Sequence, residues 1–205
     1  MNKIDLNADI GESFGSYKLG YDEEIIKYIS SSNIATGFHA GDHNWIKRTV
    51  DLSQKYNVAI GAHPSYPDLA GFGRRDMDLP PDEIENLIKY QVGALIGFVG
   101  LENIAHVKPH GALYNKAVKD EKTAKAIINA IKSISNDLIH VVLAGSMWEK
   151  LATDLGAKIS TIQLPDSSWK ITLEGLPMLK PLNIEIPSDP SSAAFPVVAS
   201  IITPN

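Results

Sequence analysis

Residues 103–115, NIAHVKPHGALYN, and residues 57–68, NVAIGAHPSYPD, share one layout, in which a short apolar run leads into a turn that carries proline and histidine. Residues 33–43, NIATGFHAGDH, show this layout with glycine in the turn, and residues 6–12, LNADIGE, place two carboxylates after an apolar start. Parallel strands present their carboxyl ends at one edge of a sheet, and ligands bind there. The sequence therefore predicts that the polar turns of separate strands gather at one mouth.

Apolar runs alternate with helical patterns along most of the chain. We expect strands at 3–8, 33–38, 57–62, 103–108, 138–144 and 157–163, and helices at 21–32, 44–56, 80–99, 118–135 and 146–155. Asn44 is expected to cap the second of these helices. Repeated strand–helix alternation is typical of an α/β fold with a parallel sheet, which is either open and doubly wound or closed into a barrel.

Composition sets limits on the partners of the chain. The 205 residues are 44% hydrophobic and carry a net charge of −5, which argues against nucleic acid or an anionic membrane surface as a partner. The sequence contains no cysteine, shows no signal-peptide pattern and has no apolar stretch near the roughly 18 residues that a spanning helix needs. We expect a cytoplasmic protein.

The polar turns supply candidates for acid and base catalysis, since carboxylates and imidazoles transfer protons near neutral pH. These candidates are Asp9, Glu12, His39, Asp42, His63 and His110. Each also has a structural alternative, because acidic residues cap helices and a lone histidine at a strand end is often only packed. We expect His43 to be exposed or to cap a helix, and His106 and His140 to be structural. The other candidates all follow expected strands, and this shared position favours a catalytic site over separate structural roles.

A second group is suited to hold a substrate. The glycine-rich loop within residues 61–75, GAHPSYPDLAGFGRR, carries Arg74, which can bind a carboxylate. Lys108 lies two residues before a candidate histidine at a strand end and can bind an anion or take part in proton transfer. Tyr114 and Asn115 follow and can donate hydrogen bonds.

Metal and nucleotide binding have less support from sequence. Asp9, His39 and His63 would make a His/His/Asp set for zinc or iron, but their spacing matches no compact ligand motif, so a metal is a minority alternative. The chain has no P-loop and no G-x-G-x-x-G fingerprint, which leaves independent nucleotide binding unsupported.

The chain contains four strings in a fixed order, which are LNADIGESFG, NIATGFHAGDH, GAHPSYPDLAGFGRR and HVKPHGALYN. Together they resemble the LamB/YcsF family over about residues 1–158. The resemblance implies a seven-stranded (β/α) barrel of the glycoside hydrolase/deacetylase type. It also implies ATP-dependent hydrolysis of 5-oxo-L-proline to L-glutamate with partner subunits B and C, which are expected to handle ATP. The ten candidate residues named above fall on matching motif positions.

The end of the chain departs from the resemblance. Family members continue through an arginine and tyrosine run to a late His-Gly-Asp strand end, whereas residues 160–205 match neither and hold seven of the twelve prolines. We therefore expect a barrel domain at 1–160, incomplete at its C-terminus, and a proline-rich tail at 161–205 of frameshifted or truncated origin, with little regular structure and Phe195 and Ile201 partly exposed. The alternatives are a non-catalytic fragment of the family and a stand-alone metal-dependent deacetylase-like hydrolase.

Overall fold

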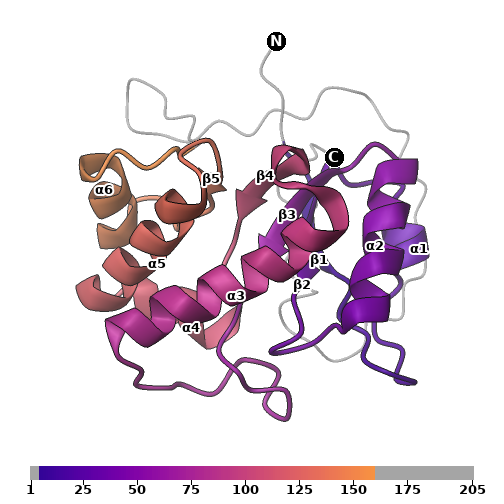
Figure 1. The fold of residues 1–205 in the computed structure, drawn as a ribbon, viewed down its shortest axis with the longest axis horizontal. Coiled ribbons are helices and arrows are strands. Elements are labelled where there is room, and N and C mark those ends of the chain that lie inside the picture. The colour runs from indigo at the N-terminus through magenta and orange to yellow at the C-terminus, as the bar shows by residue number, and fades with distance from the viewer. Residues whose placement is uncertain (1–4, 160–205) are drawn as a thin grey trace, which may run out of the picture. The chain divides into compact units, whose positions relative to one another are not determined.

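The computed structural model describes residues 5–159, in which five parallel strands form one sheet (Figure 1). The strands are β1 (Asn7–Ile10), β2 (Ser31–Ala35), β3 (Ala59–His63), β4 (Ile104–Val107) and β5 (Ile139–His140). Each strand pairs in parallel with the next strand along the chain. Their order in the sheet is β1-β2-β3-β4-β5, with no reversal.

This strand order bears on the two expected architectures, an open doubly wound sheet and a barrel. A doubly wound sheet reverses its strand order at a switch point, and the five strands here contain no such reversal. Winding in one direction is the arrangement that strands take in a (β/α) barrel. The expected parallel α/β fold is confirmed, and the number of strands in a closed barrel stays a prediction.

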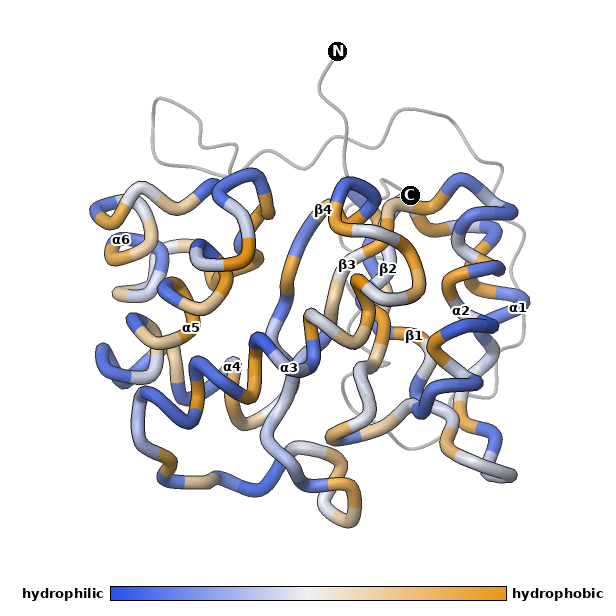
Figure 2. The backbone as a smooth tube through the Cα atoms, viewed as in Figure 1, coloured by the Kyte–Doolittle hydropathy of each residue, from blue (hydrophilic) through white to orange (hydrophobic). Residues whose placement is uncertain are grey.

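Helices follow the strands and cover the sheet, with α3 in front of it in Figure 1. They are α1 (Asp22–Ile25), α2 (His43–Lys55), α3 (Pro81–Val99), a 3-10 turn (Leu101–Asn103), α4 (Gly111–Ala117), α5 (Glu121–Ile134) and α6 (Met147–Asp154). Figure 2 shows hydrophilic and hydrophobic residues alternating along them. The apolar faces of α3 and α5 bury Ile88, Leu95 and Ile127 completely, and each such side chain contributes about 1.5–3 kcal/mol through burial.

Most element boundaries follow local signals. The longest helix has proline in its first turn and ends at Gly100, whose φ of 80° stops helical geometry, as the sequence predicts. The helix expected at 21–32 is wrong in length, because α1 ends at Ile25 and the last two expected helical residues belong to β2, which begins at Ser31. The helix expected at 118–135 is α5, and α4 before it was not predicted. Asp120 separates the two by capping α5.

No helix within residues 5–159 is both long and apolar enough to cross a bilayer. The domain boundary expected near residue 160 coincides with the end of the described residues and stays a prediction. The expectations for the proline-rich tail, including Phe195 and Ile201, lie outside the described residues.

Candidate active site

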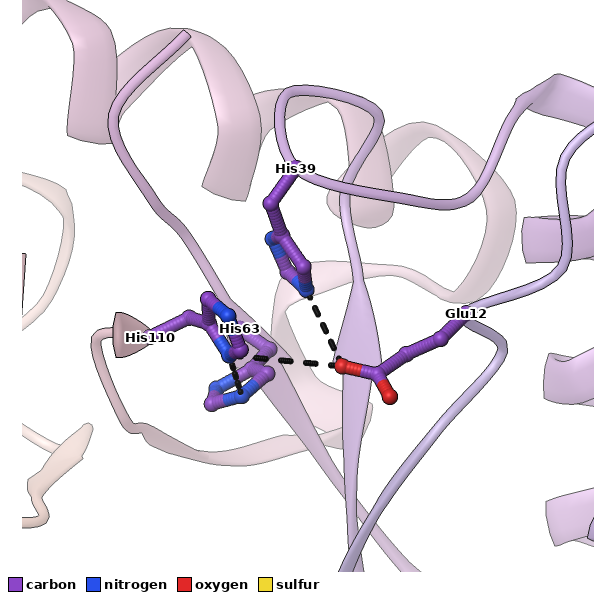
Figure 3. Close-up of side chains that lie close together, drawn as sticks. All are labelled: Glu12, His39, His63 and His110. Carbon is purple, nitrogen blue, oxygen red and sulfur yellow. Dashed lines mark hydrogen bonds and ion pairs between the residues drawn. The ribbon is translucent and has the colours of Figure 1, made fainter. Parts of the chain in front are cut away.

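Four side chains converge where the first four strands end (Figure 3). Glu12 follows β1, His39 lies in the turn after β2, His63 is the last residue of β3, and His110 lies between β4 and α4. One donor atom from each lies within 4.8 Å of the donor atoms of the others. The prediction that turns after separate strands meet at one mouth is thus confirmed for these four residues. They meet because the strands that carry them are parallel.

The cluster is tightly packed, and its three imidazoles are almost completely buried. Glu12 Oε1 lies 3.2 Å from His39 Nε2 and 4.0 Å from His110 Nδ1. His110 Nδ1 lies 3.0 Å from His63 Nε2. The rings of His39 and His110 are stacked with centroids 3.8 Å apart, while His63 meets both of them edge-on.

Backbone carbonyls hold two of the rings from behind. His63 Nδ1 lies 2.5 Å from the carbonyl oxygen of Lys108, and His110 Nε2 lies 2.9 Å from that of Phe72. Each carbonyl can only accept, so each of these nitrogens carries the hydrogen and donates it. The two rings are therefore fixed in orientation and in tautomer.

Asp9 joins the cluster from β1. Asp9 Oδ2 is 3.4 Å from His63 Nε2, and Asp9 Oδ1 accepts hydrogen bonds from Lys108 Nζ at 2.8 Å and from Asn33 Nδ2 at 2.6 Å. Asn33 Oδ1 in turn lies 2.7 Å from His106 Nε2, which makes His106 a buried structural residue, as expected. A continuous polar network thus runs beneath the site and fixes the Asp9 carboxylate.

Burial sets the protonation of the site. It lowers the pKa of His39 to about 3 and that of His110 to about 4, because an imidazolium loses its hydration there, so both rings are neutral at neutral pH. Burial also raises the pKa of Glu12. Burial would raise the pKa of Asp9 too, but hydrogen bonding and charge from His63 and Lys108 outweigh it and hold that pKa well below its usual range. The two carboxyls therefore differ in basicity.

The glycine-rich loop after β3 closes one side of the cluster. Phe72, at a φ of 54°, places its ring edge-on against His39 and His110. Gly73, at a φ of 64°, lies against the same two imidazoles, and a Cβ there would come within 2.8 Å of His39 Cβ and 2.9 Å of His110 Cδ2. Only glycine permits this approach.

The two arginines of this loop have different roles. Arg75 is committed to the buried carboxylate of Asp68, whose pKa the hydrogen bond from Arg75 lowers to about 2. Arg74 is exposed, with its guanidinium 5.6 Å from the centre of the Phe72 ring. Arg74 is thus the arginine that can reach a ligand.

A hollow of about 320 Å³ opens beside the cluster and collects most of the predicted residues. It is lined by Asp9, His63, Arg74, Lys108, Pro109, His110, Gly111, Ala112, Tyr114 and Asn115. Tyr114 is half-buried with its ring edge-on to Trp148, and Asn115 is exposed. A larger hollow of about 490 Å³ lies over α1 and α2, away from the histidines, so size alone does not mark the site.

Asp42 is the one predicted acid or base that the structure places elsewhere. Its Oδ1 accepts from the backbone N–H groups of Asn44 and Trp45, each at 2.9 Å, and its Oδ2 accepts from that of Gly15 at 2.7 Å. Asp42 therefore caps α2, the role that the sequence assigned to Asn44, because a carboxylate just ahead of the first turn satisfies two free N–H groups. His43 is exposed, as expected.

A serine motif in the β1 turn is also structural. Residues 11–15, GESFG, have the G-x-S-x-G spacing of a hydrolase nucleophile turn. Ser13 is buried, however, and its Oγ accepts from Leu19 N at 2.9 Å and donates to Leu19 O at 3.2 Å. Ser13 holds the loop in shape and has no base within its hydrogen bonds.

Sequence reasoning missed the residues that support the site. Gln91 of α3 is fully buried and bonds Ser65 N, Ser65 O and the Thr36 hydroxyl, which ties together the turns that follow β2 and β3. Asn33 orients Asp9 in the same way. Gln91 lies on the buried face of a helix and Asn33 in a buried strand. A polar residue at such a position is the sequence signal that could have marked them, because buried polar groups need hydrogen-bond partners.

Comparison with known proteins shows the family of the chain. The LamB/YcsF family profile matches residues 4–174, past the limit of 158 that the motifs suggested. The A subunit of the 5-oxoprolinase of Thermococcus onnurineus is 50% identical over 85% of this chain and 71% of its own length. That of Pyrococcus furiosus is 52% identical over 82% of this chain and 66% of its own length.

A solved structure is similar as well. The crystal structure of a lactam utilization protein from Thermus thermophilus matches with a TM-score of 0.75 and 48% identity, over 77% of this chain and 65% of that one. The chain thus spans about two thirds of the length of these relatives. With four site motifs, a matching fold and identities near one half, the chain belongs to the LamB/YcsF family.

Proposed function

We propose that this chain is the ring-opening subunit of an ATP-dependent 5-oxoprolinase, which hydrolyses 5-oxo-L-proline to L-glutamate. The observation that carries the proposal is the buried cluster of three imidazoles and Glu12 beside a hollow that holds Lys108 and Arg74. The names of the relatives, which are a lactam utilization protein and subunits of 5-oxoprolinase, support the same substrate class.

The chemistry required is addition of water to the lactam carbonyl, followed by cleavage of the ring C–N bond and protonation of the departing nitrogen. Glu12 suits the base, since burial raises its pKa above that of an ordinary carboxyl, whereas the pKa of Asp9 is held low. His110, 4.0 Å from Glu12, suits the transfer of that proton to the nitrogen.

Two cations are placed to bind the remaining charges. Lys108 bonds Asp9 through one of its three N–H groups and can direct another at the negative charge on the oxygen atoms around the attacked carbon. Arg74 lines the same hollow without a carboxylate partner among the described residues and suits the carboxylate of 5-oxoproline. Tyr114 and Asn115 supply further donors at the rim of this hollow.

The word subunit in the relatives' names supports a complex. In this proposal, partner subunits B and C bind ATP and transfer its γ-phosphoryl group to the lactam oxygen, with release of ADP. Ring opening by one water then leaves an acyl phosphate, which a second water hydrolyses to L-glutamate and inorganic phosphate. This chain contributes a seven-stranded (β/α) barrel of the deacetylase type. The absence of a P-loop from the sequence is in keeping with that division.

The test is glutamate release by this chain with and without the B and C partners and ATP. We expect turnover only with all components, and a fall of about 10²-fold or more for His110→Ala. His140→Ala is the matched control, a buried histidine outside the cluster that should act only through stability. Full turnover by His110→Ala would remove that residue from the mechanism. Turnover by the isolated chain without ATP would instead support a stand-alone hydrolase.

A further inference from the structure

Two of the clustered nitrogens face each other. His63 Nδ1 and His110 Nε2 carry the hydrogens that bond the backbone carbonyls, so His63 Nε2 and His110 Nδ1 are the nitrogens left to share a proton or to bind a metal ion. These two nitrogens are 3.0 Å apart. Two lone pairs at that distance repel each other, so the arrangement requires a positive group between them.

That group is either a proton or a metal ion. A proton on His63 Nε2 would be stabilised by Asp9 Oδ2 at 3.4 Å, but it would join only two or three atoms and leave His39 outside. A metal ion would join all the donors that converge here.

Two of the donor separations are close to those around one tetrahedral ion. Zinc lies about 2.0–2.1 Å from imidazole nitrogen and carboxylate oxygen, so neighbouring donors of a tetrahedron are roughly 3.3 Å apart. The observed separations are 3.0 Å between His63 and His110, 3.2 Å between His39 and Glu12, and 4.0 Å between His110 and Glu12. All four donor atoms lie within 4.8 Å of one another, and the stacked rings of His39 and His110 would have to turn for both to face one ion.

The surroundings also have the form of a metal site. Histidines that bind metal donate their second N–H to a carbonyl or carboxylate, as His63 and His110 do here. Magnesium and calcium prefer sets of oxygen donors, whereas three imidazoles suit zinc and neighbouring divalent transition metals.

We propose that His39 Nε2, His63 Nε2 and His110 Nδ1 bind one divalent transition-metal ion, with zinc the best match, and that its fourth position faces Glu12 Oε1. The inference deepens the proposed function, because such an ion would polarise the lactam carbonyl at the same site. The test of the inference measures metal binding directly and does not require 5-oxoprolinase activity.

The experiment measures binding directly on the full chain. Protein stripped with a chelator is titrated with Zn²⁺ against a chromophoric competitor, and with Co²⁺ while visible absorption is recorded. We expect one ion per chain and the intense absorption bands of four-coordinate Co²⁺. His63→Ala and Glu12→Gln should weaken binding, the former by about 10²-fold or more. His43→Ala, at an exposed histidine on α2, and His140→Ala should leave binding unchanged.

Circular dichroism of each variant checks folding, and Glu12→Gln tests the site if His63→Ala does not fold. No stoichiometric binding by the wild type, or equal binding by His63→Ala, would overturn the proposal and leave the shared proton as the explanation. Binding that disappears in His43→Ala would assign the ion to the surface. Glutamate release by a metal-free complex would reject a catalytic ion without touching the proposed function.

Discussion

Gly73→Ala tests whether the glycine-rich loop sets the spacing of the clustered imidazoles of His39 and His110. The added Cβ would lie 2.8 Å from His39 Cβ, 2.9 Å from His110 Cδ2 and 3.3 Å from Ser65 Cβ. Alanine at a φ of 64° also costs about 1–2 kcal/mol of backbone strain, and overpacking adds about 1–3 kcal/mol. We expect the free energy of unfolding to fall by about 2–5 kcal/mol.

Gly15→Ala is the matched control for this variant. Gly15 has a φ of 54°, but its added Cβ would meet no described heavy atom within 4 Å, so only the strain of about 1–2 kcal/mol applies. The difference between the unfolding free energies of the two variants, measured in urea, gives the cost of overpacking at Gly73, because both variants share the backbone strain. Glutamate release by the complex should fall by about 10²-fold for Gly73→Ala alone, since displaced rings lose their alignment. Equal stability and equal turnover of the two variants would show that the loop does not set this spacing.

Two further predictions concern stability. Gln91→Leu should lower the free energy of unfolding, measured in urea, by about 2–4 kcal/mol, because Ser65 and the Thr36 hydroxyl lose a buried hydrogen-bond partner. The control Gln54→Leu, on the exposed face of α2, should change it by less than about 0.5 kcal/mol. Similar losses in the two variants would contradict the role of Gln91. Burial lowers the pKa of His140 from 6.5 to about 4. As the pH falls below 6.5, the histidine therefore takes up a proton in the unfolded chain before it does so in the folded chain. This favours unfolding, so the folded protein loses stability between about pH 6.5 and pH 4. Between pH 7.5 and pH 5 the free energy of unfolding of the wild type should fall by about 2 kcal/mol more than that of His140→Leu. Parallel curves of unfolding free energy against pH for the two proteins would show that the pKa of His140 is not lowered.

The sheet and the position of the site could be predicted because both depend on local patterns. Apolar runs that end in histidine turns mark strand ends, and a parallel sheet brings such ends together whatever their separation in the chain. This rule placed Glu12, His39, His63 and His110 correctly relative to one another. It needed no knowledge of individual contacts.

The features of the site that the sequence did not predict are those in which one residue type can fill several roles. Asp42 suits both a base and a helix cap, and only the exact start of α2 decides for the cap. The tautomers of His63 and His110 depend on carbonyls of Lys108 and Phe72, which no pattern in the sequence connects to them. Asn33 also gains its role only through tertiary contact.

Whether the cluster opens the lactam ring is decided by glutamate release from 5-oxo-L-proline in the ATP-supplied complex that contains Glu12→Gln. The substitution keeps the size of the side chain at the cluster but removes its basicity, and Glu24→Gln on exposed α1 is the matched control. We predict a loss of about 10²-fold or more for Glu12→Gln, with normal turnover for Glu24→Gln. Normal turnover by correctly folded Glu12→Gln would contradict the assignment of ring opening to this cluster.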